Sequence, residues 1–215
     1  MDNIRNVIFP ESASYEIEND AFRNCVNLQS ALLPSGFTKI GNAAFYSCSN
    51  LESAFIPNTI QTLGGNIFDN YQKLTDVTLE EGLTVIGSTM FYHCHNLVTI
   101  SIPETVESIG EDVFWECQNL ENVTLPEGLK ILGSHIFSYC SKIKSIYIPP
   151  NIEIYCKNGN RNHRSFRNCQ GLETITFGEG ISTLGPGMFY SCHNLKSIFL
   201  PNTLKSIESE LFYDC

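Results

Sequence analysis

The stretch that decides the fold runs from residue 97 to residue 117 and reads LVTISIPETVESIGEDVFWEC. Its Phe114 belongs to a series of nine phenylalanines that recur every 23 residues, apart from one interval of 29 residues. The series is Phe22, Phe45, Phe68, Phe91, Phe114, Phe137, Phe166, Phe189 and Phe212. A fixed period of this length is the signature of a repeat protein, in which one short unit is stacked on the next.

Other positions keep the same phase as the phenylalanine. Three residues after it lie Cys25, Cys48, Cys94, Cys117, Cys140, Cys169, Cys192 and Cys215, with Tyr71 in the third repeat. Two apolar residues such as Ile100 and Ile102 then alternate with polar ones, which predicts a short strand with one buried face. Pro103 ends that strand, because proline donates no hydrogen bond to a sheet, and Gly110 supplies a bend.

One unit is therefore predicted to be a strand, a turn, a helical or 3-10 segment that carries the phenylalanine, and a turn back. Such a unit cannot bury its own apolar side, but a stack of units can. Nine strand segments, from residues 7–10 to residues 197–201, would pair in parallel and form a sheet on the order of 40 Å long.

The unit L-x-x-I-x-I-P-x-x-V-x-x-I-G-x-x-x-F-x-x-C resembles the BspA-like class of leucine-rich repeats over the whole chain. The resemblance implies a curved solenoid with a parallel sheet on the concave face and short helical or 3-10 segments on the convex face. It also implies a cell-surface or secreted protein of the kind found in anaerobic bacteria and protozoan parasites. Some members are adhesins, so the implied partner is a protein ligand, with host extracellular matrix among the candidates.

Residues 1–215 are expected to form a single solenoid domain of about nine repeats. Six extra residues enter between Pro150 and Phe166, where Tyr155-Cys156 stands in place of the expected Ile-Gly. This predicts an inserted loop near residues 152–165, either functional or a tolerated surface insertion. The chain stops at Cys215, a core position, so we expect it to be part of a longer repeat array.

The composition excludes several classes of protein. A net charge of -10 argues against nucleic-acid binding, and no run of 18 apolar residues is present for direct membrane insertion. Residues 1–10 do not resemble a signal peptide, which keeps a cytoplasmic location open as the alternative. The stretch between Lys73 and Lys130 contains ten acidic residues and no basic one, whereas residues 130–167 carry seven of the thirteen basic residues.

No residue pattern points to catalysis, to a metal or to a cofactor. The nine cysteines lack a C-x-x-C pair, and eight share one repeat position. They form either a buried row of free thiols, the interpretation that we favour, or bridges between neighbouring coils. His93-Cys94-His95 looks like a metal-binding fragment, but the repeat phase turns Cys94 inward and its neighbours elsewhere. We therefore expect a non-enzymatic binding module, or, as the alternative, an intracellular scaffold.

The strand phase predicts which residues such a module presents. Positions eight and ten after each phenylalanine must face solvent on the sheet side. At the tenth position stand the large side chains Leu32, Phe55, Tyr147 and Phe199, and we predict that they contact a protein partner, with Lys157, Arg161 and Arg164 at the edge. Strand propensity alone is the competing explanation for these aromatic residues. A second row, for which packing between coils is the competing explanation, is Tyr46, Tyr92, Trp115, Tyr190 and Tyr213.

Overall fold

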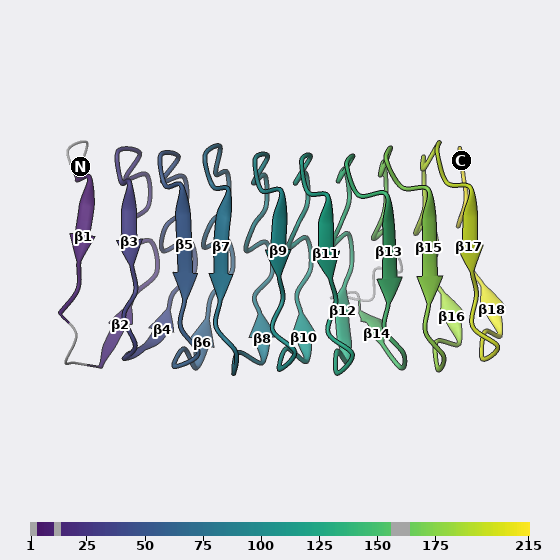
Figure 1. The fold of residues 1–215 in the computed structure, drawn as a ribbon, viewed down its shortest axis with the longest axis horizontal. Helices are drawn as coiled ribbons and strands as arrows, with labels where there is room; N and C mark the ends of the chain where they lie inside the picture. Colours follow the sequence, from purple (N-terminus) through teal and green to yellow (C-terminus); the bar gives the residue numbers. More distant parts are fainter. Residues whose placement is uncertain (1–3, 11–13, 156–163) are drawn as a thin grey trace.

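The computed structural model describes residues 4–10, 14–155 and 164–215, which wind into a parallel β-solenoid with two short strands in each coil (Figure 1). The first row of strands, here called the front sheet, contains β1 (Asn6–Ile8), β3 (Ser30–Leu32), β5 (Ser53–Ile56), β7 (Asp76–Leu79), β9 (Thr99–Ser101), β11 (Asn122–Thr124), β13 (Ser145–Ile148), β15 (Thr174–Phe177) and β17 (Ser197–Phe199). The second row contains β2 (Tyr15–Ile17), β4 (Phe37–Ile40), β6 (Thr62–Leu63), β8 (Val85–Ile86), β10 (Ser108–Ile109), β12 (Ile131–Gly133), β14 (Glu153–Tyr155), β16 (Thr183–Leu184) and β18 (Ser206–Ile207).

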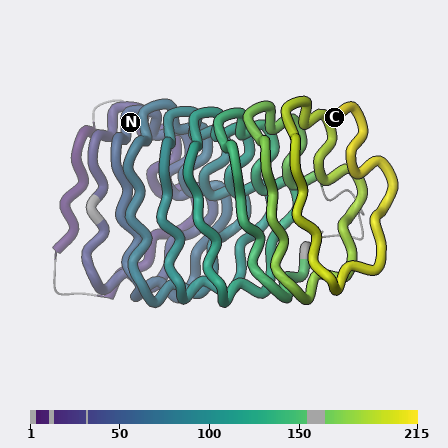
Figure 2. The backbone as a smooth tube through the Cα atoms, turned by 45° about the vertical axis from the view of Figure 1, so that its right-hand side comes forward, coloured from purple at the N-terminus to yellow at the C-terminus, as the bar shows by residue number. Residues whose placement is uncertain are grey.

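Where neighbouring strands of a row pair, they pair in parallel. Asn122 of β11 lies opposite Thr99 of β9, and Ile109 of β10 lies opposite Ile86 of β8, each 23 residues apart. The coils therefore superpose along one axis, with the two ends of the chain at opposite ends of the stack (Figure 2). The front sheet was predicted from its alternating pattern. The second row was not, because its strands are two to four residues long and show only one or two apolar positions.

The segment that carries each phenylalanine is a pair of turns, so the predicted helical or 3-10 segment was wrong for the residues that the structure describes. The residues two before and two after Phe114 have positive φ, 56° at Asp112 and 57° at Glu116. A right-handed helix needs negative φ throughout, so left-handed residues on both sides end it within one turn. The amides bond to the next coil instead, as when the Phe114 N–H donates to the Ile136 carbonyl at 3.0 Å.

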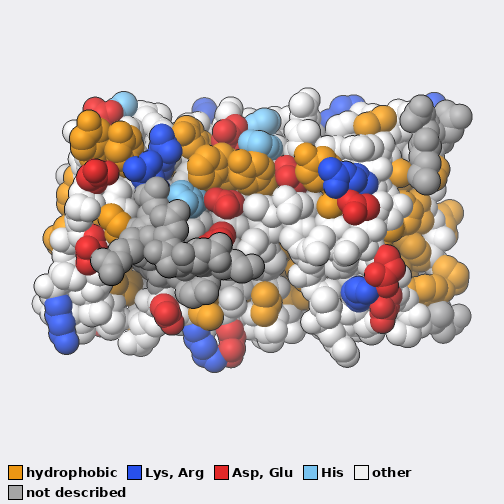
Figure 3. All heavy atoms as spheres, turned by 180° about the vertical axis from the view of Figure 1, so that it is seen from behind, with side chains coloured by type: hydrophobic (Ala, Val, Ile, Leu, Met, Phe, Trp, Pro, Cys, Tyr) orange, Lys and Arg blue, Asp and Glu red, His pale blue; other side chains and the backbone are white. Residues whose placement is uncertain are grey.

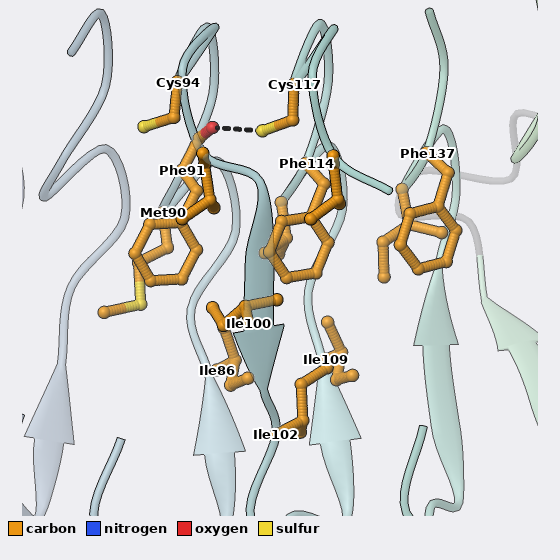
Figure 4. Close-up of a cluster of buried hydrophobic side chains, with 14 of the residues drawn as sticks. Ile86, Met90, Phe91, Cys94, Ile100, Ile102, Ile109, Phe114, Cys117 and Phe137 are labelled. Carbon is orange, nitrogen blue, oxygen red and sulfur yellow. Dashed lines mark hydrogen bonds between the residues drawn. The ribbon is translucent and has the colours of Figure 1, made fainter. Parts of the chain in front are cut away.

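The phenylalanines form one continuous stack along the solenoid axis. Consecutive ring centroids lie between 5.1 and 6.1 Å apart, and the ring planes are nearly parallel (Figure 4). The seven inner rings are buried, whereas Phe22 is half-buried and Phe212 is 42% exposed at the last coil. The predicted burial of the phenylalanines between coils is thus confirmed for every coil that has a neighbour on both sides.

The cysteine row lies beside the phenylalanine stack as free thiols. The Cys117 thiol donates a hydrogen bond to the Phe91 carbonyl of the preceding coil at 3.1 Å (Figure 4), and six further thiols make the equivalent contact. In the third repeat the buried Tyr71 hydroxyl donates to the Phe45 carbonyl. The slot therefore selects a hydrogen-bond donor, which explains why a tyrosine can replace the thiol. Cys156 lies outside the described residues.

From β4 to β12, a glycine ends or directly follows each second strand, and close contact between coils requires it there. A Cβ atom on Gly133 would lie 2.3 Å from the carbonyl oxygen of Gly110, and one on Gly87 would lie 2.6 Å from that of Gly64. No side chain fits between backbones at that distance. The glycine therefore marks a corner at which each coil rests directly on the one before it.

The repeat departs from this rule in the coil that contains the insertion. In β14, Tyr155 lies opposite Gly133 and Ile154 opposite the preceding Leu132, so Ile154-Tyr155 and not Tyr155-Cys156 replaces the expected Ile-Gly. The prediction was one residue late because residues 149–152 form a turn one residue shorter than residues 126–130 of the preceding coil. The predicted loop near residues 152–165 is also narrower than expected, since residues 153–155 belong to β14.

Candidate functional site

The outward row of the front sheet holds the residues predicted to bind a partner. Tyr147 of β13 lies opposite Thr176 of β15, and Thr176 lies opposite Phe199 of β17. Two strand spacings therefore separate the aromatic residues, roughly 10 Å. Tyr147 is 42% exposed and Phe199 is 57% exposed, while Phe55 of β5, opposite Thr78, is half-buried. The predicted outward orientation at these three positions is confirmed.

The same row begins with a residue that the sequence analysis missed. Leu32 of β3 lies opposite Ile8 of β1, and the Ile8 side chain is 91% exposed. The repeat was phased on phenylalanine, and no phenylalanine precedes this strand at the required spacing. The strand itself, residues 7–10, was predicted, so its alternation alone could have placed Ile8 on the outward face.

A shallow depression lies beside Tyr147 on the front sheet. Its volume is about 360 Å³, and its lining includes Asn122, Thr124, Tyr147, Thr174 and Thr176. The depression spans the junction between β11 and β13, which are not ladder partners, although β9 pairs with β11 and β13 with β15. The front sheet thus offers an aromatic ring at the edge of a hollow lined by hydroxyl and amide groups, with Glu121 as the charged residue in its lining.

The outward face of the front sheet carries almost no charge. The positions eight residues after phenylalanine include one charged residue, Asp76. They are Ser30, Ser53, Asp76, Thr99, Asn122, Ser145, Thr174 and Ser197. The tenth-position row contains only Leu, Phe, Thr, Ser and Tyr. A surface that lacks charge in a chain of net charge -10 has little desolvation cost when an uncharged partner surface covers it.

A second surface, here called the back row, follows the phenylalanine stack on the other side of the solenoid. Tyr92 stacks on Trp115 at 5.9 Å between ring centroids, Trp115 lies 5.2 Å from Tyr139, and Tyr190 stacks on Tyr213 at 4.8 Å. Hydrophobic, basic and histidine side chains lie along this side of the molecule in Figure 3. These contacts confirm that packing between coils accounts for much of this row.

The basic residues predicted at the edge of the sheet-face site do not gather there. Lys157 and Arg161 lie outside the described residues. Arg164 lies in the back row, where its guanidinium carbon is 4.8 Å from the centroid of the Tyr190 ring. The structure therefore groups Arg164 with the back row and not with Tyr147 and Phe199.

Carboxylates and histidines cluster at the middle of the back row. Glu116 lies 3.7 Å from both His93 and His95, and Asp112 lies 3.6 Å from His135. Burial, followed by the charge of Glu111, raises the pKa of Asp112 to about 6. Cys94 is buried between the two histidines in sequence, as predicted.

Two kinds of feature are missing from the described part of the chain. Within residues 4–10, 14–155 and 164–215, no group of three His, Cys, Asp or Glu side chains is arranged to hold a metal ion. Over the same residues, no helix has the length and apolar character needed to cross a membrane.

The described residues form a solenoid of stacked repeats, and their inward side chains pack in its core. The profile of the BspA type leucine-rich repeat region matches six copies over residues 1–121, 62–160 and 85–215. The chain therefore belongs to the BspA-type leucine-rich repeat family.

Solved leucine-rich repeat proteins share this fold. A leucine-rich repeat protein from Bacteroides ovatus is 26% identical with a TM-score of 0.73, over 96% of this chain and 57% of that one. The leucine-rich repeat protein of T. pallidum is 21% identical with a TM-score of 0.63, over 94% and 79%. The pneumococcal vaccine antigen PcpA is 21% identical with a TM-score of 0.56, over 96% and 57%. This chain thus spans little more than half of the Bacteroides protein, and no curated protein matches it.

Proposed function

We propose that this chain is a non-catalytic module that binds a protein partner through the outward face of the front sheet. The observation that carries the proposal is the exposure of Tyr147 and Phe199 on either side of Thr176, on strands held in fixed register. Aromatic side chains on a rigid surface are frequent anchors of protein interfaces. Phe55 extends this surface toward the other end of the sheet, and Leu32, whose side chain lies outside the described residues, is proposed as a further contact with Lys157 and Arg161 at the periphery.

The setting that we propose is a cell surface, with extracellular matrix proteins as the first candidates. The family resemblance and the pneumococcal antigen among the structural neighbours support this setting. The uncharged sheet face supports a polypeptide over a nucleic acid, since phosphate binding requires basic side chains.

The test compares two triple variants, each of which replaces three hydrophobic surface residues by serine. One changes Phe55→Ser, Tyr147→Ser and Phe199→Ser, and its control changes Val85→Ser, Ile131→Ser and Ile207→Ser, which are exposed on the second row of strands. Binding to immobilised matrix proteins is then measured after thermal stability has been matched. The proposal requires the first variant to lose at least tenfold in affinity and the control to keep the parent affinity. Equal affinities for the two variants would contradict it.

An intracellular scaffold that uses the same face is the second candidate. The observation that favours it is that all eight cysteines of the described residues are unpaired, as expected in a reducing compartment. Alkylation of the denatured protein in freshly lysed native cells separates the two settings. A fully reduced set of nine thiols supports the scaffold, and any disulfide supports the surface setting.

A further inference from the structure

Two arginines of one coil lie close to the ring of Tyr190. The guanidinium carbon of Arg164 is 4.8 Å from the Tyr190 ring centroid, and that of Arg167 is 5.4 Å away. The arginines come from the coil before Tyr190, and Tyr213 of the following coil stacks on Tyr190 at 4.8 Å. The stem of Arg164 fits there because Gly187 has no side chain, since a Cβ at Gly187 would lie 3.2 Å from its Cγ.

This pair of positive charges is incompletely neutralised. Arg164 has its ion-pair partner, Glu210, at 3.9 Å, and for Arg167 the described residues offer only the rings of Tyr139 and Tyr190. The Nε atoms of both arginines are buried without a hydrogen-bond partner among the described residues. Like charges held close together in a chain of net charge -10 favour an anion between them.

The opposite charge lies two coils away along the same row. Asp112 and Glu116 flank Trp115, and the histidines near them stand at 3.6 to 3.7 Å, which compensates their charge only when the imidazoles are protonated. Two coil spacings amount to roughly 10 Å. The half-buried ring of Tyr139 belongs to the coil between the two ends and lies 5.2 Å from that of Trp115 at the acidic end.

We propose that this part of the back row is a second interface, which binds an extended polypeptide segment with an acidic side chain opposite Arg164 and Arg167 and a basic side chain opposite Asp112 and Glu116. In the polyproline II conformation, which has three residues per turn and rises about 3.1 Å per residue, residues i and i+3 face the same side roughly 9 Å apart, so the two charges stand at these positions. The carboxylates at one end disfavour a uniformly anionic ligand such as a polysulfated glycan. This interface is independent of the sheet face, because its residues belong to a different surface.

The probe is the synthetic peptide GSDVTKSG, which contains no tryptophan. Trp115 is the only tryptophan of the chain and lies within the proposed interface, so its fluorescence reports binding directly. At low salt we expect saturable binding of GSDVTKSG. The all-acidic peptide GSDVTDSG and the all-basic peptide GSKVTKSG should each bind about three- to fivefold more weakly.

Variants of the protein identify which end reads which charge. Arg164→Gln with Arg167→Gln should weaken GSDVTKSG about three- to fivefold and should not change the affinity for GSNVTKSG, in which the acidic residue is removed. Asp112→Asn with Glu116→Gln should weaken the binding of GSDVTKSG to the same extent and should not change the affinity for GSDVTQSG, in which the basic residue is removed. The Phe55→Ser, Tyr147→Ser, Phe199→Ser variant should bind every peptide as the parent does, which separates this interface from the proposed function. The proposal would be overturned if no binding were saturable, or if the all-acidic and mixed peptides bound equally well. It would also be overturned if each protein variant lost as much affinity for the peptide that lacks the matching charge as for GSDVTKSG.

Discussion

The front sheet and the back row are built from the same repeat, yet their side chains differ in how much they contact one another. On the front sheet, Tyr147 and Phe199 are separated by Thr176 and remain exposed. In the back row, Trp115 touches both Tyr92 and Tyr139, and it is half-buried. A strand points alternate residues straight out, whereas the tight turns around each phenylalanine bring side chains of successive coils together. The front sheet therefore has side chains free for a partner, and the back row has side chains that already stabilise the stack.

The largest expected effect comes from the core that both surfaces share. Phe114→Ala should lower the free energy of unfolding by about 3–5 kcal/mol, because it opens a cavity between the Phe91 and Phe137 rings. Urea unfolding followed by circular dichroism measures the change, and Thr124→Ala on the outward face serves as the control. A loss below about 1 kcal/mol would contradict the continuous stack.

The thiol row should make the fold sensitive to alkali. Burial raises the pKa of the Cys192 thiol to about 12, whereas an unfolded thiol ionises at about 8.5. Above that pH the unfolded state loses the proton first, so stability falls as pH rises, until the folded pKa is reached.

Cys192→Ser removes this titration and keeps a donor for the Phe166 carbonyl. In reductant, the parent should lose about 2 kcal/mol more than the variant between pH 7.5 and pH 10, by urea unfolding at each pH. Identical pH dependence in the two proteins would show that the thiol is not buried as described.

Asp112 distinguishes the back row from the front sheet, where the outward face is almost uncharged. Its folded pKa of about 6 exceeds the unfolded value of about 3.9, so its charge destabilises the fold above pH 6 and the effect disappears as pH falls below 4. Since its side chain is 30% exposed, we expect Asp112→Asn to stabilise the protein by only about 1 kcal/mol at pH 8 and not at all at pH 4. Equal effects at both pH values would refute this assignment.

The smallest effect tests the comparison itself. Tyr147→Ser should change the free energy of unfolding by less than about 0.5 kcal/mol, whereas Trp115→Ser should cost about 1–2 kcal/mol because it loses contacts with two neighbouring rings. Thermal or urea unfolding of the two variants side by side gives the difference. Equal costs would mean that the two surfaces are not distinct in packing.

The sequence determined the period, the front sheet and its outward residues, because alternation in a strand translates directly into orientation. It did not reveal the left-handed residues at Asp112 and Glu116, since glutamate gives no signal of positive φ and the preference of a single aspartate is weak, and it therefore predicted a helix. The pairing of Arg164 and Arg167 on Tyr190 also escaped it, because the contact joins two successive coils and depends on the missing side chain of Gly187.

Hydroxyl-radical footprinting of the chain, free and bound to a matrix protein that it captures, tests the central claim most directly. If the front sheet binds the partner, oxidation of Phe55, Tyr147 and Phe199 should fall on binding, while oxidation of Val85 and Ile131 on the second row of strands should not change. Protection confined to Val85, Ile131 or the back row, with Tyr147 and Phe199 oxidised as in the free protein, would contradict the assignment of the front sheet as the binding surface.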